Sequence, residues 1–354
     1  LYIRVILFSI FLISCGEKNE MLLVPENHSN ISFNNEVIES DSLNILNYEY
    51  IYNGGGVAIA DFNRDGKEDI YFTGNVVNNK LYLNEGDFVF NDVSSISQTE
   101  CKGSWSMGVS VIDINNDKWP DMYVSVSGKG EAINRKNILL INQGINKDSI
   151  PIFENMAEEY GLDHTGYTIN SYFFDFDQDG DNDVYLINNF FTNRGDVLSK
   201  RNTSSNLIND NVNVLFENID GKSFKDITIP AGVLNDGYSL SANIFDINDD
   251  GWLDIFVSND FATSSSAYIN QKDGTFKEDI VSYFKHESFS SMGVDVADFD
   301  NNGSDDLITL DMLPRTLSRT KKMFSRSNFL FYFSNIIRVI VITKLLLNCF
   351  HLLI

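Results

Sequence analysis

Short apolar runs, each bounded by polar turn residues, recur along the chain from residue 43 to residue 314. Runs such as VAIA (57–60), MYVSV (122–126) and VYLIN (184–188) are rich in β-branched and aromatic residues, which favour strands. They have the length of strands and are too short for stable helices, and Gly, Asn and Asp separate them. The pattern therefore predicts an all-β fold for this region.

An acidic phrase of nine residues recurs five times, each time between two of these apolar runs. The copies are DFNRDGKED (61–69), DINNDKWPD (113–121), DFDQDGDND (175–183), DINDDGWLD (246–254) and DFDNNGSDD (298–306). Each phrase and its flanking runs offer about four short strands, and a sheet of that size must stack against neighbours to bury both faces. We therefore expect a β-propeller of four-stranded blades.

The acidic phrase suits a hard cation. Acid or amide occupies its first, third, fifth and ninth positions in every copy, and Ca²⁺ takes six to eight oxygens from carboxylates, amides and backbone carbonyls. A carbonyl at position seven completes the set. The predicted ligand residues are Asp61, Asn63, Asp65, Lys67 and Asp69; Asp113, Asn115, Asp117 and Asp121; Asp175, Asp177, Asp179, Asp181 and Asp183; Asp246, Asn248, Asp250, Trp252 and Asp254; and Asp298, Asp300, Asn302, Ser304 and Asp306.

The charge density of these phrases supports the same interpretation. They hold 20 of the 50 acidic residues of the chain, and converging carboxylates need a counter-ion because they repel one another. The bland alternative is that each Asp is an ordinary turn former that caps its own backbone. That alternative explains one phrase, but it does not explain the same four positions in all five. We expect about four to five bound Ca²⁺ ions.

The sixth position of the phrase must turn sharply, which favours glycine at positive φ. Gly66, Gly180, Gly251 and Gly303 occupy it in four copies, whereas the second copy has Lys118. The lysine adds strain and positive charge, so we expect the second site to be weak or empty.

An EF-hand begins with the same spacing but closes with a bidentate Glu at its twelfth position and has flanking helices. Here the twelfth positions are occupied by residues without a carboxylate, namely Phe72, Val124, Leu186, Val257 and Thr309. The phrase therefore joins two strands.

Overall charge and composition limit the possible partners. The 354 residues include 50 acidic and 26 basic side chains, for a formal net charge of −24. Such a chain repels nucleic-acid phosphates and attracts cations, so no nucleic-acid partner is expected. Hydrophobic residues make up 43% and aromatic residues 13% of the chain, which is too much for a disordered acidic protein.

The two ends of the chain differ from its middle. Residues 1–15 form a mostly apolar segment that resembles the signal peptide of bacterial lipoproteins, and LISCG (12–16) resembles their lipobox, with Cys15 as the lipidated residue. Residues 16–42 read as a polar tether. Residues 315–354 contain no Asp or Glu, and we interpret this basic and apolar tail as the product of a shifted reading frame. A membrane anchor is the alternative, although no uncharged run of 18 residues is present.

The repeats resemble those of a known family. Residues 50–314, from YIYNGGGVAIADFNRDGKEDIYFTGN to ITLDMLP, look like the FG-GAP or VCBS repeats of integrin-α-like propellers. They are similar to bacterial outer-membrane lipoproteins related to cartilage acidic protein, which carry a further ASPIC/UnbV module. The resemblance implies calcium in the acidic loops and a location at the outer membrane. Propellers of this type usually close with seven blades, so the five visible repeats predict an incomplete ring.

No catalytic constellation stands out in the sequence. The four histidines, His28, His164, His286 and His351, are isolated from one another, and no G-x-S-x-G or phosphate-binding loop occurs. We therefore expect a non-enzymatic, envelope-anchored calcium-binding module for adhesion to a glycan or protein. The alternative is a polysaccharide lyase or hydrolase on the same fold.

Two smaller signals have bland explanations that we prefer. The tripeptide Arg194-Gly195-Asp196 matches an integrin ligand but recurs by chance. Trp105, Trp119 and Trp252 can form a sugar platform, yet aromatic residues in such repeats more often fill the cores of blades.

Overall fold

The computed structural model describes residues 22–48, 50–189, 212–260, 263–285, 287–288, 291–311 and 339–342. The predicted lipobox Cys15, the tripeptide 194–196, His286, His351 and all of the predicted tail except residues 339–342 lie outside the described residues. The four-part division of the chain that the sequence suggested therefore stays a prediction.

The described chain forms five successive sheets, which we call blades 1 to 5, in agreement with the all-β prediction. In blades 1 to 4, four strands that follow one another in the chain are also neighbours in the sheet, and each pair is antiparallel. Blade 5 has one antiparallel pair, and a third strand pairs with it in parallel. The strands are β1 (Val57–Ala60), β2 (Asp69–Phe72), β3 (Lys80–Gly86) and β4 (Val89–Asp92); β5 (Trp105–Ile112), β6 (Asp121–Ser127), β7 (Ile138–Ile145) and β8 (Pro151–Asn155); β9 (Thr168–Phe174), β10 (Asp183–Asn188), β11 (Val214–Ile219) and β12 (Ser223–Asp226); β13 (Ser239–Phe245), β14 (Asp254–Asn259), β15 (Ser266–Asn270) and β16 (Phe276–Glu278); and β17 (Ser291–Ala297), β18 (Asp306–Asp311) and β19 (Val339–Ile342).

Short helices of one turn decorate these sheets. They are α1 (Glu26–Ser29), the 3₁₀ helix η1 (Ala132–Arg135), α2 (Ala157–Tyr160), α4 (Thr228–Ala231) and α5 (Ile280–Tyr283). None of the helices in the described part of the chain is long and apolar enough to span a membrane.

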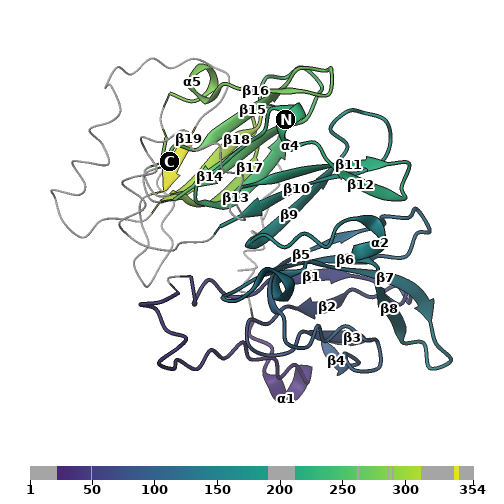
Figure 1. The fold of residues 1–354 in the computed structure, drawn as a ribbon. Coiled ribbons are helices and arrows are strands. Elements are labelled where there is room, and N and C mark those ends of the chain that lie inside the picture. Colours follow the sequence, from purple (N-terminus) through teal and green to yellow (C-terminus); the bar gives the residue numbers. More distant parts are fainter. Residues whose placement is uncertain are drawn as a thin grey trace, which may run out of the picture.

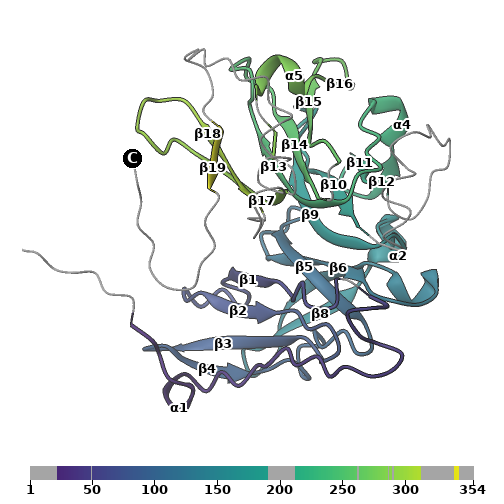
Figure 2. The same ribbon diagram turned by 90° about the vertical axis from the view of Figure 1, so that its left-hand side faces the viewer.

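The blades stack in chain order through their first strands. Strand β1 packs beside β5, β5 beside β9, β9 beside β13, and β13 beside β17. The succession runs from the purple and blue blades at the bottom of Figures 1 and 2 to the green and yellow blades at the top. This side-by-side arrangement is the radial stacking that the small repeat units require, because a single blade cannot bury both of its faces.

The core consists of apolar layers between successive blades. Side chains alternate across each strand, so Met122 and Val124 of β6 face blade 1 while Tyr123 packs toward blade 3. All seven residues of β6 are buried. The apolar runs of the second strands therefore reflect burial on both faces of a blade, which also explains why they lack a strict polar alternation.

A segment before blade 1 also packs into this structure, and we call residues 31–51 the N-terminal strap. The Phe33 ring stacks on Phe72 of β2 with 5.0 Å between the ring centroids. Further along, Tyr48 meets Trp105 of β5 edge to face at 5.3 Å. Tyr48 and Ile51 also belong to a buried cluster that contains Tyr238, immediately before β13. The strap thus connects blade 1 with blades 2 and 4, and it includes residues that the sequence suggested were a polar tether.

We expect the strap to contribute to stability through Tyr48, whose side chain is 3% exposed. The variant Tyr48→Ala should lower the free energy of unfolding by about 3–5 kcal/mol, because truncation of a buried aromatic residue leaves a cavity. Tyr52→Ala is the matched control, since Tyr52 is 61% exposed. Urea denaturation monitored by circular dichroism measures both changes. An equal, small effect of the two variants would show that the strap does not stabilise the blades.

Candidate metal centre

Each acidic phrase forms the loop between the first and second strands of one blade. We call them loop 1 (61–69), loop 2 (113–121), loop 3 (175–183), loop 4 (246–254) and loop 5 (298–306). Because each blade begins with the same hairpin and neighbouring first strands pack side by side, the five loops lie at the same end of the stack. The sequence prediction that the phrase joins two strands is confirmed.

The first residue of each loop organises the turn through its carboxylate. In loop 3, Asp175 Oδ1 accepts the N–H of Asp179 and Asp175 Oδ2 accepts the N–H of Gly180, both at 3.1 Å. The same pair of bonds, from positions five and six, occurs in the other four loops. These are the local side-chain bonds that favour Asp in turns. They leave further lone pairs on the carboxylate for a cation.

The backbone of the loops has the left-handed conformation that was predicted for position six. The glycines there have φ of 85–99°, and Lys118 in loop 2 has φ of 72°. Position four is also left-handed, with φ of 57–60° in every loop and no glycine in any of them. Sequence reasoning missed this second turn position. Its side chains are Arg64, Asn116, Gln178, Asp249 and Asn301.

The ninth residue of each loop begins the second strand and is almost completely buried. In loop 3, Asp183 Oδ2 accepts the N–H of Phe176 at 3.1 Å, and Asp183 Oδ1 accepts the N–H of Asn218 on β11 at 2.8 Å. Asn84, Asn142 and Asn270 hold the ninth Asp of loops 1, 2 and 4 in the same way. The ninth carboxylates of loops 1 to 4 therefore fasten their loops to the third strand of the blade.

These asparagines are functional positions that the sequence prediction did not include. Their signal was an Asn at the end of the third apolar run in blades 1, 2 and 4, in YLN (82–84), LIN (140–142) and YIN (268–270), with Asn218 at the related place in blade 3. The recurring asparagine was visible in the sequence. The Asp that it contacts, however, lies 15–35 positions earlier in the chain, so no local pattern indicated the bond.

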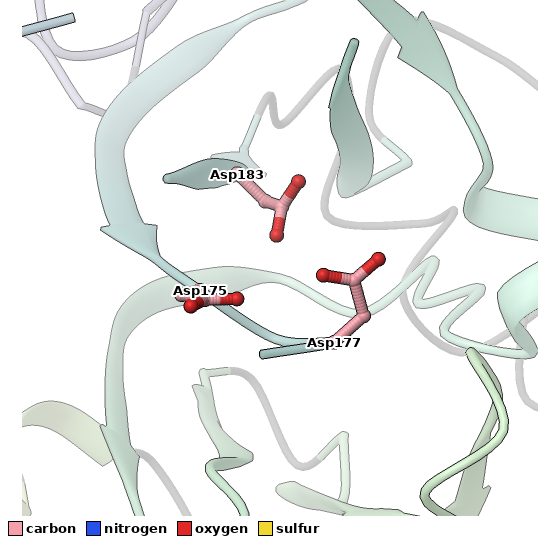
Figure 3. A group of neighbouring side chains, drawn as sticks. All are labelled: Asp175, Asp177 and Asp183. Carbon is pink, nitrogen blue, oxygen red and sulfur yellow. The ribbon is translucent and has the colours of Figure 1, made fainter. Parts of the chain in front are cut away.

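Two of the five loops bring three carboxylates together. One carboxylate oxygen from each of Asp175, Asp177 and Asp183 lies within 4.8 Å of the other two (Figure 3), and the same holds for Asp298, Asp300 and Asp306. Two oxygens on one calcium ion are no more than roughly 5 Å apart, given their distance from the metal. The two triads can therefore hold a metal ion, and without one their charges repel.

Two further oxygens support the fit of a cation to these loops. Asp181 Oδ1 at position seven of loop 3 and Asn248 Oδ1 at position three of loop 4 are shielded from solvent and have no hydrogen-bond partner. Buried oxygens normally accept a hydrogen bond or bind an ion. Carboxylate and amide oxygens are the donor set of a hard cation such as Ca²⁺.

The remaining predicted ligands lie in loops 1, 2 and 4, each of which has a lysine in the loop or in contact with it. Loops 1, 2 and 4 have Asn rather than Asp at position three, and no carboxylate triad is found among their described residues. Lys67 Nζ lies 2.8 Å from Asp65 Oδ2 in loop 1, and Lys272 Nζ lies 3.3 Å from Asp250 Oδ2 in loop 4. Loop 2 contains Lys118 itself. Loops 3 and 5 thus differ from loops 1, 2 and 4 in having a carboxylate triad.

Burial gives four ninth-position carboxyl groups unusual pKa values. Desolvation raises the pKa of Asp69 and Asp254 to about 6 and that of Asp121 and Asp183 to about 7. The backbone N–H bonds lower these pKa values and the neighbouring acids of each loop raise them. In the absence of a cation, Asp121 and Asp183 are therefore partly protonated near neutral pH, whereas Asp69 and Asp254 take up protons at about pH 6.

Other candidates from the sequence lie elsewhere. His28 Nε2 is 2.8 Å from the carbonyl oxygen of Asp87, in the turn between β3 and β4. His164 packs edge to face against Phe216. The Trp119 ring lies under the guanidinium of Arg64, 5.0 Å from its centroid.

Comparison with known proteins identifies the repeats but not the whole chain. The sequence profile of the FG-GAP-like repeat matches residues 61–124 and 246–309. No curated protein is significantly similar to the chain.

Among solved structures, one match is a lectin of Agrocybe aegerita described as specifically recognising non-reducing terminal N-acetylglucosamine. It has a TM-score of 0.31 and 16% sequence identity, and the match covers 62% of this chain and 49% of the lectin chain. The chain therefore spans about half the length of that relative.

The raised pKa of Asp183 predicts a pH-dependent stability of the metal-free chain. The folded state binds this proton more tightly than the unfolded state, whose carboxyl has a pKa near 3.8. The stabilisation by this proton is therefore fully present below pH 3.8 and is lost as the pH rises through about 7. In EDTA, Asp183→Asn should make urea stability less dependent on pH across this range. The control is Asp273→Asn in an exposed turn, and equal pH dependence in wild type and Asp183→Asn would contradict the expectation.

The left-handed Lys118 predicts that Lys118→Gly strengthens calcium binding by loop 2. Glycine removes roughly 1–2 kcal/mol of backbone strain, partly offset by about 0.5–1 kcal/mol of chain entropy, and it removes a positive charge from the loop. Lys118→Ala is the control because it removes the charge and keeps the strain. Calorimetric titration of both variants separates the two effects, and unchanged binding by Lys118→Gly would show that the loop is limited by its other ligands.

Proposed function

We propose that this chain is a calcium-binding β-propeller module that binds a ligand at the bacterial cell envelope and does not convert it chemically. The observation that carries the proposal is the convergence of three carboxylates in each of two recurring loops. The match of the FG-GAP-like repeat to residues 61–124 and 246–309 supports it, because these segments include complete acidic loops.

Calcium is the cation that we propose for these loops. The donors are carboxylate and amide oxygens with a backbone carbonyl at position seven, and the loop is long enough to supply more than the six ligands of an octahedron. Magnesium demands near-ideal octahedral geometry and tends to keep its waters, whereas calcium accepts six to eight oxygens in flexible geometry. We propose that loops 3 and 5 bind most tightly, because each has a carboxylate triad and neither has a lysine among its nine residues.

The proposed role of calcium is structural. An ion in a loop neutralises the carboxylates at the start of the second strand and removes the need for Asp183 and its counterparts to stay protonated. It also fixes the hairpin of the first two strands, which packs against both neighbouring blades. The loops at the opposite end of the blades are then held rigidly, and we propose that they present a binding face to a glycan or protein.

The proposed location is the outer membrane, with the chain held by lipid on Cys15. The lipobox-like LISCG sequence supports this anchor. The net charge of −24 suits a calcium-containing environment outside the cell and disfavours nucleic acid as a partner. The residues that carry the anchor lie outside the described part of the chain.

Calcium removal tests the proposal. In millimolar calcium the melting temperature should rise relative to EDTA, because an ion that binds only the folded state stabilises it by about 2.7 kcal/mol per site at 100 times its Kd. Asp177→Ala and Asp300→Ala should each remove one tight site in calorimetric titration and reduce the rise. Asp273→Ala, outside the ligand set, is the control. A melting temperature that EDTA leaves unchanged would sink the structural role of calcium.

A further inference from the structure

A chain of buried hydrogen bonds connects loop 1 with loop 2. In loop 1, the N–H of Phe62 donates to Asp69 Oδ2 at 3.0 Å. The carbonyl oxygen of Phe62 accepts a bond from Asn142 Nδ2 of blade 2 at 2.9 Å, and the N–H of Asn142 donates to Asp121 Oδ1 of loop 2 at 2.8 Å. Three successive bonds thus join the ninth carboxylate of one loop to that of the next, and we call this chain the relay.

The relay recurs between loops 3 and 4. The N–H of Phe176 donates to Asp183 Oδ2 at 3.1 Å, and the carbonyl oxygen of Phe176 accepts from Asn270 Nδ2 at 2.7 Å. The N–H of Asn270 donates to Asp254 Oδ1 of loop 4, also at 2.7 Å. These four residues are at most 3% exposed, so water does not compete effectively for the bonds.

A second contact joins the same two pairs of loops. The left-handed position four directs a side chain toward the next blade in both cases. Arg64 of loop 1 covers the Trp119 ring of loop 2, and Gln178 Nε2 of loop 3 donates to the Gly251 carbonyl of loop 4 at 2.9 Å. The relay and the position-four contact therefore coincide in the two pairs.

The equivalent asparagine of blade 3 makes different hydrogen bonds. Asn218 Nδ2 donates to the Asn182 carbonyl of its own blade at 3.1 Å. Asn142 and Asn270 make this bond within the blade too, to Pro120 and Leu253, in addition to the relay. Blade 3 thus supplies a natural comparison. Its asparagine has the local bond, and among the described residues its side chain makes no hydrogen bond to loop 2.

We propose that loops 1 to 4 bind their cations as two coupled pairs, loop 1 with loop 2 and loop 3 with loop 4. The inference rests on the proposed calcium function. An ion in loop 3 fixes Asp183 and, through Phe176, the amide of Asn270, which in turn holds Asp254 in place for loop 4. The carboxylate that binds the second ion is therefore already ordered, so the entropy lost when that ion binds is smaller and its affinity is higher. Asn270 is a positioning residue in this scheme.

The two loops of the second pair are unequal. Loop 3 has the carboxylate triad, whereas loop 4 has Asn248 at position three and a lysine 3.3 Å from Asp250. We expect loop 3 to fill first and to raise the affinity of loop 4. By thermodynamic reciprocity, loss of loop 4 ligands weakens loop 3 by the same factor.

Terbium luminescence can read loop 4 separately in the full chain. Tb³⁺ replaces Ca²⁺ at oxygen sites, and the indole of Trp252 at position seven of loop 4 sensitises its emission. A Trp119→Phe background removes the equivalent indole of loop 2, and Trp252→Phe in that background identifies the remaining signal. In this background, removal of the loop 3 ligands by Asp175→Ala with Asp177→Ala should weaken Tb³⁺ binding at loop 4 roughly 5- to 20-fold.

Asn270→Ala decides whether the relay carries this effect. With Asn270→Ala, removal of the loop 3 ligands should change loop 4 affinity by less than about two-fold, whereas with the matched control Asn218→Ala the full drop should persist. An equal drop with and without Asn270, or no drop in the parent, would overturn the coupling while calcium binding itself stands. Absence of any Tb³⁺ or Ca²⁺ binding would overturn both.

A second measurement covers the case in which the ligand-deleted chain does not fold. Asn270→Ala alone keeps every carboxylate of both loops, so calcium calorimetry can compare its stepwise affinities with those of Asn218→Ala. The proposal requires that Asn270→Ala weakens the second step of the pair and leaves the number of sites unchanged. A merely structural role would instead lower the melting temperature in EDTA by the same amount and leave the ratio of the two steps as in the control.

Discussion

Mutual repulsion of carboxylates is the constraint on which the rest of this structure depends. Each blade turns from its first to its second strand through a loop that gathers negative charge at the edge of a buried strand. The ninth Asp cannot simply move to solvent, because both of its oxygens accept backbone N–H groups and its side chain is covered by the blade. The charge must therefore be neutralised where it stands, by protons or by a cation.

The same carboxylates connect electrostatics to packing. Because the ninth Asp fastens its loop to the third strand, the state of the loop affects the register of the blade and not only its rim. Aromatic and branched residues pack between the blades on both faces of the second strand. An ordered blade therefore also restrains the blades on either side of it. Repeats that contact only their neighbours behave as a one-dimensional array, so local changes pass mainly to the adjacent unit. The two relays are specific hydrogen-bonded connections through which a change in one loop can reach the adjacent loop.

Sequence reasoning predicted the elements whose signal is local and repeated. The all-β class, the four-stranded units, the strand-loop-strand position of the phrase and the left-handed turn at Lys118 follow from short patterns and from their repetition along the chain. The convergence of Asp175, Asp177 and Asp183 agrees with the predicted ligand spacing. The predicted ligands of loops 1, 2 and 4 include Asn at position three, and the lysine contacts of loops 1 and 4 come from side chains whose direction no local pattern specifies.

The strap and the relay could not be derived in this way, because both depend on contacts between distant parts of the chain. The strap residue Tyr48 packs in one cluster with Tyr238, and 190 positions separate them. The strap therefore finds part of its docking site only after blade 3 has been made and synthesis has reached residue 238. Contacts between residues so far apart in the chain form slowly. The blades that fold early therefore do so before the strap has docked. Until synthesis passes residue 238, the cluster of Tyr48 and Ile51 lacks Tyr238, and apolar surface exposed in this way makes a nascent chain prone to aggregate.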